Sequence, residues 1–499
     1  MTRTERTLLT ATLAATAFAV AGRPGPWGPL GYTAAGLLHL AIVMAPRRKL
    51  AVLAATVAAV GPASVAVVPL APLHPLGALA LALTIAVSFA PVGAFAFVAR
   101  GGRSGLEAAA LGATGPLRTG LRTTLAWLAI EWAWSAPWLL GRFAFPVVAT
   151  GSVLADGPVR ALAAVVGSTG LSAVVMLVGT GLAWLVTTPH SPRRQLRTTL
   201  RWTVAAAVPL LLALPSAAAD AAPGETRLAS IVPDGSAFRL RLVQHQPTPA
   251  QTAAARFSAT EQRRLHAPLT ASLERHDGRL VIWPEGAWPE PIDPREPAAG
   301  PDPRGASLLF GAATVRGGDT FNSVLLASGG RLTIVADKAQ PVAFTEAQLT
   351  AGQPGRVTSW QGASLAAAVC WDAVFPHLAL AAARAGAVVL FYLADDSYDA
   401  GGPVGGLHLR QARLRAVESG IPVVLVQATG PSAAIAADGR IVARLPAGTP
   451  GHLDLDLPLT TRSTVPRWIG NPSGPASTLA TVLLFGVRKR RTRRKGGEA

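Results

Sequence analysis

The sequence predicts a polytopic α-helical membrane bundle joined to an α/β sandwich domain. Half of the 499 residues are hydrophobic and only 14% are charged, whereas soluble domains carry about a quarter charged residues. The deficit is confined to residues 1–220, while residues 225–465 have an ordinary globular composition. We therefore predict a membrane domain over 1–220 and a second domain over 225–465, which is long enough for a core of its own.

Apolar stretches of near-membrane length precede residue 220, and one more follows the second domain. Several reach the ~20 residues that a helix needs to cross a bilayer. We expect about eight spans, seven before the α/β domain and one after it, with a basic tail over 488–499. The stretches are Leu8–Ala21, Leu30–Ala45, Leu50–Leu70, Gly77–Val98, Thr123–Leu140, Ala161–Val186, Thr203–Ala219 and Gly474–Val487.

The basic residues gather in every second loop between these stretches. By the positive-inside rule, those loops and the tail Arg488–Lys495 are cytoplasmic, and residues 225–465 lie outside the cytoplasm. The net charge of +18 therefore indicates anchoring at an anionic membrane surface and argues against nucleic-acid binding. The basic residues of the predicted cytoplasmic side are Arg3, Arg6, Arg47, Arg48, Lys49, Arg100, Arg103, Arg118, Arg122, Arg193, Arg194, Arg197 and Arg201.

From residue 238 onward, short β-rich runs alternate with helical stretches. This pattern predicts an α/β sandwich rather than a βαβ Rossmann unit, and neither GxGxxG nor a P-loop is present. The expected strands are Leu240–His245, Leu280–Trp283, Leu308–Thr314, Ser323–Ala327, Leu332–Val335, Leu365–Val369, Val388–Tyr392, Val423–Gln427 and Ala433–Ala436. The expected helices are Thr260–Arg275, Pro376–Arg384 and Gly405–Ser419, and the Gly329–Gly330 pair predicts a hairpin turn.

Cys370 is the only cysteine, and it follows the expected strand Leu365–Val369. A single thiol forms no internal disulfide and no cysteine-based zinc site. Two interpretations remain for it, an inert buried thiol or a nucleophile.

Two further residues follow expected strands in the same way. Glu285 stands in a turn between Pro284 and Gly286, and Lys338 follows the strand that ends near Val335. Taken singly, Glu285 is more simply explained as a solvent-exposed loop carboxylate and Lys338 as an ordinary surface lysine. Together with Cys370 they form a workable catalytic set, because a carboxylate can deprotonate a thiol and an ammonium can stabilise an oxyanion.

Glu131 lies inside the fifth apolar stretch, close to three tryptophans that end with Trp138. A carboxylate there is costly, so it has either a function or a buried hydrogen-bond partner on a neighbouring helix. The tryptophans form either an interfacial belt or, with Glu131, a lipid entrance.

The order of these motifs resembles the nitrilase (carbon–nitrogen hydrolase) superfamily. The resemblance rests on Trp283-Pro-Glu285, on Lys338 with Glu346 eight residues later, and on Cys370-Trp-Asp372. With spans on both sides of the domain, the chain is similar to the bacterial apolipoprotein N-acyltransferases. Further matching motifs are Phe321-Asn-Ser323, Arg415-Ala-Val-Glu418-Ser-Gly420, Glu131 and Pro137-Trp138-Leu-Leu-Gly141.

The resemblance implies a nitrilase-like αββα domain held outside the bacterial inner membrane. A phospholipid would donate an acyl chain to Cys370, and the N-terminal amine of a diacylglyceryl-cysteine apolipoprotein would accept it. Glu285 would act as general base and Lys338 would stabilise the oxyanion. Glu346, Trp371 and Asp372 would support them. We expect no cofactor, no metal and a monomer.

Three segments depart from the family pattern and leave the acceptor open. Asp395–Asp399 replaces a usual Asn-Asp-Ala-Trp-Phe, Ala428-Thr-Gly430 replaces Asn-Thr-Gly, and His245 lies in a segment that usually reads Gln-Gly-Asn-Ile. The alternatives are a membrane-tethered amidase with water or another amine as acceptor, and a non-enzymatic transporter or lipid-binding protein. The few ionisable residues in the spans and the intact Glu, Lys and Cys argue against the last.

Overall fold

The computed structural model describes residues 1–99, 114–146, 150–187, 237–248, 250–251, 259–274, 277–296, 300–303, 305–343, 345–399 and 401–495. The chain divides into two compact units. The helical unit comprises Met1–Ala71, Pro75–Leu214 and Asn471–Ala499, and the α/β unit comprises Pro72–His74 and Pro215–Gly470. The domain boundary predicted near residues 220–225 lies outside the described residues.

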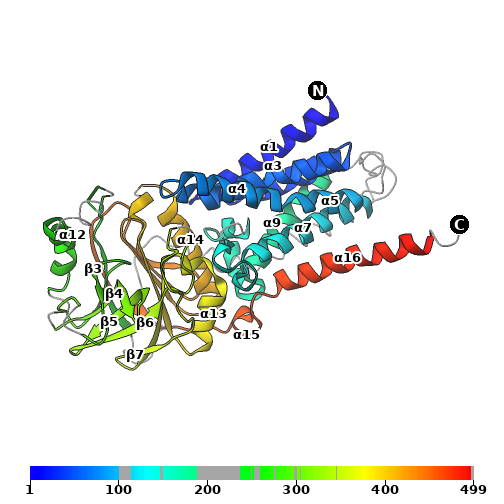
Figure 1. The fold of residues 1–499 in the computed structure, drawn as a ribbon. Coiled ribbons are helices and arrows are strands. Elements are labelled where there is room, and N and C mark those ends of the chain that lie inside the picture. The colour runs from blue at the N-terminus through cyan, green and yellow to red at the C-terminus, as the bar shows by residue number, and fades with distance from the viewer. Residues whose placement is uncertain are drawn as a thin grey trace. The chain divides into compact units, whose positions relative to one another are not determined.

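Helices cover seven of the eight predicted spans in the helical unit (Figure 1). Three segments, Arg48–Val67, Pro75–Val98 and Pro158–Trp184, are long and apolar enough to cross a membrane, each with a mean hydropathy of 2.1. A count of eight spans stays a prediction, and the span Thr203–Ala219 lies outside the described residues. The helices are α1 (Arg3–Gly22), α2 (Leu30–Met44), α3 (Arg48–Val67), α4 (Pro75–Ser88), α5 (Ala90–Ala99), α7 (Thr114–Trp134), α8 (Pro137–Leu140), α9 (Ala163–Thr187) and α16 (Ser473–Lys495).

The α/β unit contains two sheets. The first has the order β13-β1-β2-β4-β5-β6 with β3 paired to β4, and the second has the order β12-β11-β10-β9-β8-β7. The strands are β1 (Ala237–Gln244), β2 (Leu280–Ile282), β3 (Trp288–Ile292), β4 (Ser307–Arg316), β5 (Asp319–Ser328), β6 (Arg331–Asp337), β7 (Thr358–Trp360), β8 (Ala363–Val369), β9 (Val389–Ala394), β10 (Val423–Gln427), β11 (Ala433–Ile435), β12 (Ile441–Arg444) and β13 (Gly451–Pro458). The helices are α12 (Ala259–Ala271), α13 (Pro376–Arg384), α14 (Val404–Ser419) and α15 (Val465–Ile469).

Alternating side chains on the strands produce three apolar layers. On β2, Leu280 and Ile282 face the core between the sheets, whereas Val281 packs with Leu269 of α12. On β9 the odd-numbered residues face that same central core, and Leu390 packs with residues of α13 and α14. This follows from the two-residue period of a strand. The layers are therefore α, β, β and α, with α12 on one side of the sheets and α13 and α14 on the other (Figure 1).

The predicted α/β sandwich is confirmed. The sequence pattern was interpreted as a sandwich rather than βαβ units, but the sandwich contains parallel strand pairs that are connected by helices. β1 pairs in parallel with β2, and β8, β9 and β10 are parallel to one another, with α12, α13 and α14 as the crossovers. All nine expected strands are present, and α13 and β10 have the expected bounds. Five elements were not predicted from the sequence, because they are short or carry polar and charged residues at alternate positions: β3, β7, β12, β13 and α15.

Candidate active site

Three predicted site residues follow strands that end in the same region of the α/β unit. Glu285 comes three residues after β2, Lys338 directly follows β6, and Cys370 directly follows β8. All three side chains are buried, with exposed fractions of 8%, 1% and 8%. Buried ionisable groups need partners, because an unpaired buried charge is very costly. The structure brings the three residues together and supplies those partners.

The turn that carries Glu285 is fixed by its backbone. Gly286 has a φ of 62°, a conformation that glycine adopts without strain. The turn rests on Gly311 of β4, whose N–H donates to the Pro284 carbonyl at 3.2 Å. A Cβ added to Gly311 would lie 2.6 Å from the Glu285 Cα atom. Glycine at 311 is therefore required for the turn to approach β4 this closely.

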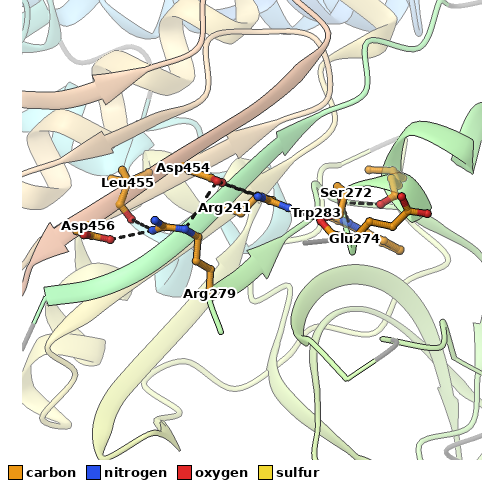
Figure 2. A network of polar contacts seen from close by, with 9 residues as sticks. Arg241, Ser272, Glu274, Arg279, Trp283, Asp454, Leu455 and Asp456 are labelled. Carbon is orange, nitrogen blue, oxygen red and sulfur yellow. Dashed lines mark hydrogen bonds and ion pairs between the residues drawn. The ribbon is translucent and has the colours of Figure 1, made fainter. Parts of the chain in front are cut away.

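A polar network supports the strand that leads into this turn (Figure 2). The Trp283 indole N–H donates to Ser272 Oγ at 3.0 Å. Arg241 donates to the Ser272 carbonyl at 3.0 Å and the Glu274 carbonyl at 2.8 Å, and its other nitrogens bind both carboxylate oxygens of Asp454. The network ties β1, β13 and the chain after α12 to the residue two before Glu285.

Cys370 has a left-handed backbone, with a φ of 47°. A non-glycine residue in this region is strained by about 1–3 kcal/mol and persists only where its surroundings hold it. It begins a 3-10 turn, Cys370–Val374. Arg415 of α14 binds the Val374 carbonyl at 3.0 Å and pairs with Glu418 at 2.7 Å.

Asp372 joins this turn to the segment that follows Lys338. Its carboxylate accepts the N–H groups of Val369 at 3.1 Å, Ala339 at 3.1 Å and Gln340 at 2.9 Å. Burial raises the pKa of this carboxyl to about 6, although Lys338 and the three N–H groups oppose the increase. Asp372 therefore fixes the backbone of the nucleophile candidate relative to that of the lysine.

The Lys338 ammonium lies between two carboxylates. Its Nζ is 2.7 Å from Glu346 Oε1 and 3.3 Å from Glu285 Oε1. The other Glu346 oxygen accepts the Val342 N–H at 2.7 Å. Burial alone would lower the pKa of Lys338, but Glu285, Cys370 and Glu346 outweigh burial and raise it well above its ordinary value. Lys338 is therefore a permanent cation at neutral pH.

Both Glu285 oxygens are held by donors. Oε1 accepts from Asn322 Nδ2 at 2.7 Å as well as from Lys338, and Oε2 accepts the Asp395 backbone N–H at 2.8 Å. The Cys370 thiol lies within electrostatic reach of the same carboxylate. Burial and then the charge of Glu285 raise the pKa of that thiol well above its ordinary value. A resting thiol with an adjacent carboxylate is the arrangement that general-base activation of a nucleophile requires.

Comparisons with known proteins show what this chain is similar to. A family model for carbon-nitrogen hydrolases matches residues 239–467. An apolipoprotein N-acyltransferase from Bradyrhizobium diazoefficiens is 30% identical over 407 residues, which cover 72% of each chain. The chain belongs to the apolipoprotein N-acyltransferase family. The enzyme of that name from Rhodopseudomonas palustris is 29% identical over 71% of this chain and 72% of its own length. A crystal structure of an amidase from Nesterenkonia sp. is 25% identical and aligns with 46% of this chain and 94% of its own, with a TM-score of 0.35.

Membership in the apolipoprotein N-acyltransferase family confirms the predicted acyltransferase and the nitrilase-like domain. It also confirms the resemblance inferred from the motifs. The single cysteine fits the catalytic cysteine of such an enzyme. Among the residues that the structure describes, no three His, Cys, Asp or Glu side chains gather into a metal site.

The three segments that depart from the family pattern are hydrogen-bonded to one another beside the site. The Gln246 N–H, next to His245, donates to the Ala428 carbonyl at 3.0 Å, and the Thr429 N–H donates to Asp396 Oδ1 at 2.8 Å. Asp395 follows Ala394 and contacts Glu285, and burial followed by the charge of Glu285 raises the pKa of the Asp395 carboxyl to about 6. Trp371 packs against Phe375, with ring centroids 6.4 Å apart.

Glu131 and Trp138 differ in exposure. Glu131 is 2% exposed, and its Oε1 accepts from Trp127 Nε1 at 2.7 Å and from the N–H and hydroxyl of Thr150 at 2.7 and 2.5 Å. These contacts favour the interpretation of Glu131 as a buried group bonded to a neighbouring segment. Trp138 is 73% exposed and lies 5.6 Å from the Trp132 ring, and its part in a lipid entrance stays a prediction.

Asn322 and Arg415 contact the site, although the sequence alone gave neither residue a role. Asn322 lay in a matching motif, and counting from the Gly329–Gly330 turn would have placed it opposite Asp337. The register shifts by one residue between Val324 and Leu325, so that Ser323 pairs with Asp337 and the Lys338 N–H binds the Asn322 carbonyl at 2.7 Å. No sequence signal marks that irregularity.

Proposed function

We propose that this chain transfers an acyl chain from a phospholipid, through a thioester on Cys370, to the N-terminal amine of a diacylglyceryl-cysteine apolipoprotein. The observation that carries the proposal is the buried group of Cys370, Glu285 and Lys338 in a chain that belongs to this family. The names of the relatives supply the acceptor class. The apolar helices of the other unit suit a lipid donor.

In the first half-reaction, Glu285 takes the thiol proton and the Cys370 sulfur attacks the ester carbonyl of the donor. The negative charge moves from the carboxylate to the sulfur and then to the carbonyl oxygen. Lys338 remains a cation beside this path, since it lies 3.3 Å from Glu285 and is also held by Glu346. An ammonium aimed at the developing oxyanion lowers the barrier. Collapse expels the glycerol hydroxyl of the lysophospholipid, which takes its proton from Glu285.

In the second half-reaction, the amine nitrogen attacks the thioester carbonyl. Glu285 accepts a proton from that nitrogen, the carbon–nitrogen bond forms and the carbon–sulfur bond breaks. The thiolate that leaves recovers the proton from Glu285, so the enzyme returns to its starting state. One nucleophile serves donor and acceptor in turn, and the kinetics are expected to be ping-pong.

A nitrilase-fold amidase or hydrolase is the alternative, because the same three residues can use water as acceptor. Isolated acyl-enzyme, prepared with labelled phospholipid, separates the two functions. We expect slow deacylation in buffer and rapid transfer of the label to a diacylglyceryl-cysteine peptide. A matched peptide with an acetylated N-terminus is the control. Fast deacylation in buffer that the peptide does not change would replace the transferase with a hydrolase.

The proposal places the α/β unit outside the cytoplasm of a bacterial cell membrane. The alternation of basic loops supports this orientation, although Arg100, Arg103 and the basic residues from 193 to 201 lie outside the described part of the chain. Reporter fusions at residue 300 and at the C-terminus test it. A cytoplasmic signal from residue 300 would refute the orientation.

A further inference from the structure

Helix α15 carries most of the exposed large apolar side chains of the α/β unit. Among the described residues from 237 to 470, Val315, Val465, Trp468 and Ile469 are exposed by 37%, 39%, 71% and 65%. Three of these four belong to α15. Residues i, i+3 and i+4 share one side of a helix, so these three side chains form a single surface, the α15 face. Exposed apolar side chains that cluster on one surface, rather than lying scattered, are a candidate interaction site.

Positive charge lies at the base of the α15 face. Arg384 binds the Arg467 carbonyl at 2.5 Å and the Pro466 carbonyl at 3.2 Å, and Arg467 binds the Ala383 carbonyl at 2.8 Å. In the part of the chain that the structure describes, neither guanidinium pairs with a carboxylate. Their charges are therefore not neutralised by the protein, and they are complementary to an anionic partner.

Two features favour a lipid surface over a protein partner. A five-residue helix offers far less than the roughly 800 Å² per partner that a stable protein interface buries. In addition, the chain passes from α15 through Gly470 into α16, whose Leu479, Val482 and Leu483 are exposed by 60%, 61% and 56%. Tryptophan beside basic residues at the end of an apolar helix is typical of the membrane–water interface.

We propose that the α15 face docks on the anionic surface of a lipid bilayer and orients the α/β unit on it. This inference rests on the membrane location in the proposed function and adds the surface through which the catalytic unit meets the lipid. Trp468 and Ile469 enter the headgroup region, while Arg384 and Arg467 lie near lipid phosphates.

The α15 face is connected by hydrogen bonds to the candidate nucleophile. Thr464 caps α15 by accepting the Arg467 N–H, and its hydroxyl donates to the Glu418 carbonyl of α14 at 2.5 Å. Glu418 pairs with Arg415, which binds the Val374 carbonyl of the Cys370 turn. A surface fixed in this way sets the height and tilt of Cys370 above the bilayer.

The unique cysteine makes a direct test possible. In full-length Cys370→Ser protein in nanodiscs with anionic lipid, a nitroxide is attached at Trp468→Cys, and at Val315→Cys as the exposed apolar control. We expect the label at 468 to be more accessible to oxygen than to a water-soluble nickel complex, and the label at 315 to show the reverse. Equal access of the nickel complex to both labels would refute docking. A label at 468 shielded from both reagents would assign the face to a protein and also refute it.

A second, kinetic measurement uses protein that retains Cys370. Trp468→Ser with Ile469→Ser is expected to raise KM for phospholipid in nanodiscs about 5- to 10-fold, because two apolar side chains no longer enter the interface. Val315→Ser is the matched control and should not change it. An unchanged KM in the double variant would count against docking. The spin-label measurement requires no catalysis, so absence of acyl transfer in the unsubstituted chain would refute the proposed function alone.

Discussion

Each unit of the molecule buries a glutamate, and the two are held by different kinds of donor. In the helical unit, Glu131 accepts from an indole, a hydroxyl and a backbone N–H, all of them neutral. In the α/β unit, Glu285 accepts from an amide, a backbone N–H and the Lys338 ammonium, and a thiol adjoins it. The first arrangement joins two segments, whereas the second can also move a proton.

Burial alone does not identify a catalytic carboxylate. Both glutamates are under 10% exposed, at 2% and 8%. The distinguishing feature is a neighbour that can give up a proton, together with a fixed cation that stabilises the charge produced. Only Glu285 has both among its described neighbours. Substitutions at the two sites should therefore differ in kind.

The largest effect is expected at Cys370. Cys370→Ala removes the sulfur that would carry the acyl chain, and loss of a covalent nucleophile costs on the order of 10⁶-fold in rate in other enzymes. Cys370→Ser should retain little activity, since a hydroxyl is much harder to deprotonate than a thiol. Labelled phospholipid and neutral hydroxylamine, which cleaves thioesters, measure the acyl-enzyme. Persistent labelling of the alanine variant would identify another nucleophile.

Glu285→Gln should come next, with acylation slower by about 10²–10⁴-fold, the usual contribution of a general base. Glutamine retains an oxygen for the Asn322 amide but accepts no thiol proton. The rate should therefore recover partly as the pH rises and the thiol ionises without help. Single-turnover acylation between pH 7 and 10 gives this profile. A parallel profile in the variant and the parent would remove Glu285 as the base.

Lys338→Met is expected to slow acylation by about 10²–10³-fold, the typical cost of one oxyanion donor. Methionine has a similar length but no charge, so Glu285 and Glu346 lose their shared cation. Lys338→Arg is the charge-retaining control. Equal rates for the methionine variant and the parent would exclude an electrostatic role.

Asp372→Asn should have a smaller effect, about tenfold on acylation, because hydrogen bonds to a charged acceptor are stronger than those to a neutral one. The pKa of Asp372 is raised by burial to about 6, so the folded protein binds this proton more tightly than the unfolded chain does. Its contribution to stability is complete below the unfolded pKa near 4 and is lost as the pH rises through 6. The thermal midpoint of the parent should therefore fall between pH 4 and 6, and the asparagine variant should show a flatter curve. An unchanged slope would assign the effect to Asp395, whose pKa is also near 6.

Which features of the fold and the site could be predicted from the sequence depends on whether they are local or join residues far apart in the chain. Strand periodicity and the residues directly after strands are local, so β8 followed by Cys370 and β2 followed by the Glu285 turn were predictable. The Glu285–Lys338 ion pair joins residues 53 positions apart. Their places after strands grouped both residues with Cys370 as a catalytic set, but no local signal predicted that the two side chains are in contact. The bond from the Asp395 backbone N–H had no signal, since any residue supplies an N–H group.

The same distinction between local features and distant contacts applies to the helical unit. Hydropathy identified the apolar stretches, but it does not show what a buried polar group contacts. The partner of Glu131 is Thr150, in a 3-10 turn, Thr150–Leu154, beyond the end of the predicted span. Threonine is common in such segments, so its presence in the sequence does not predict a contact with Glu131. The interpretation of Glu131 therefore depended on the structure.

The smallest catalytic effect is expected at Glu131. Glu131→Gln retains a carbonyl oxygen for Thr150 and Trp127, so acyl transfer should stay within about twofold of the parent. Glu131→Ala leaves buried donors unpaired, each at a cost of about 1–3 kcal/mol, and should lower the thermal midpoint by several degrees, at about 2–4 °C per kcal/mol. Thermal unfolding in detergent, with acylation measured on the same samples, separates the two effects. A glutamine variant that is as stable as the parent but slow in acylation would give Glu131 a part in lipid entry, and the contrast between the two buried glutamates would then be lost.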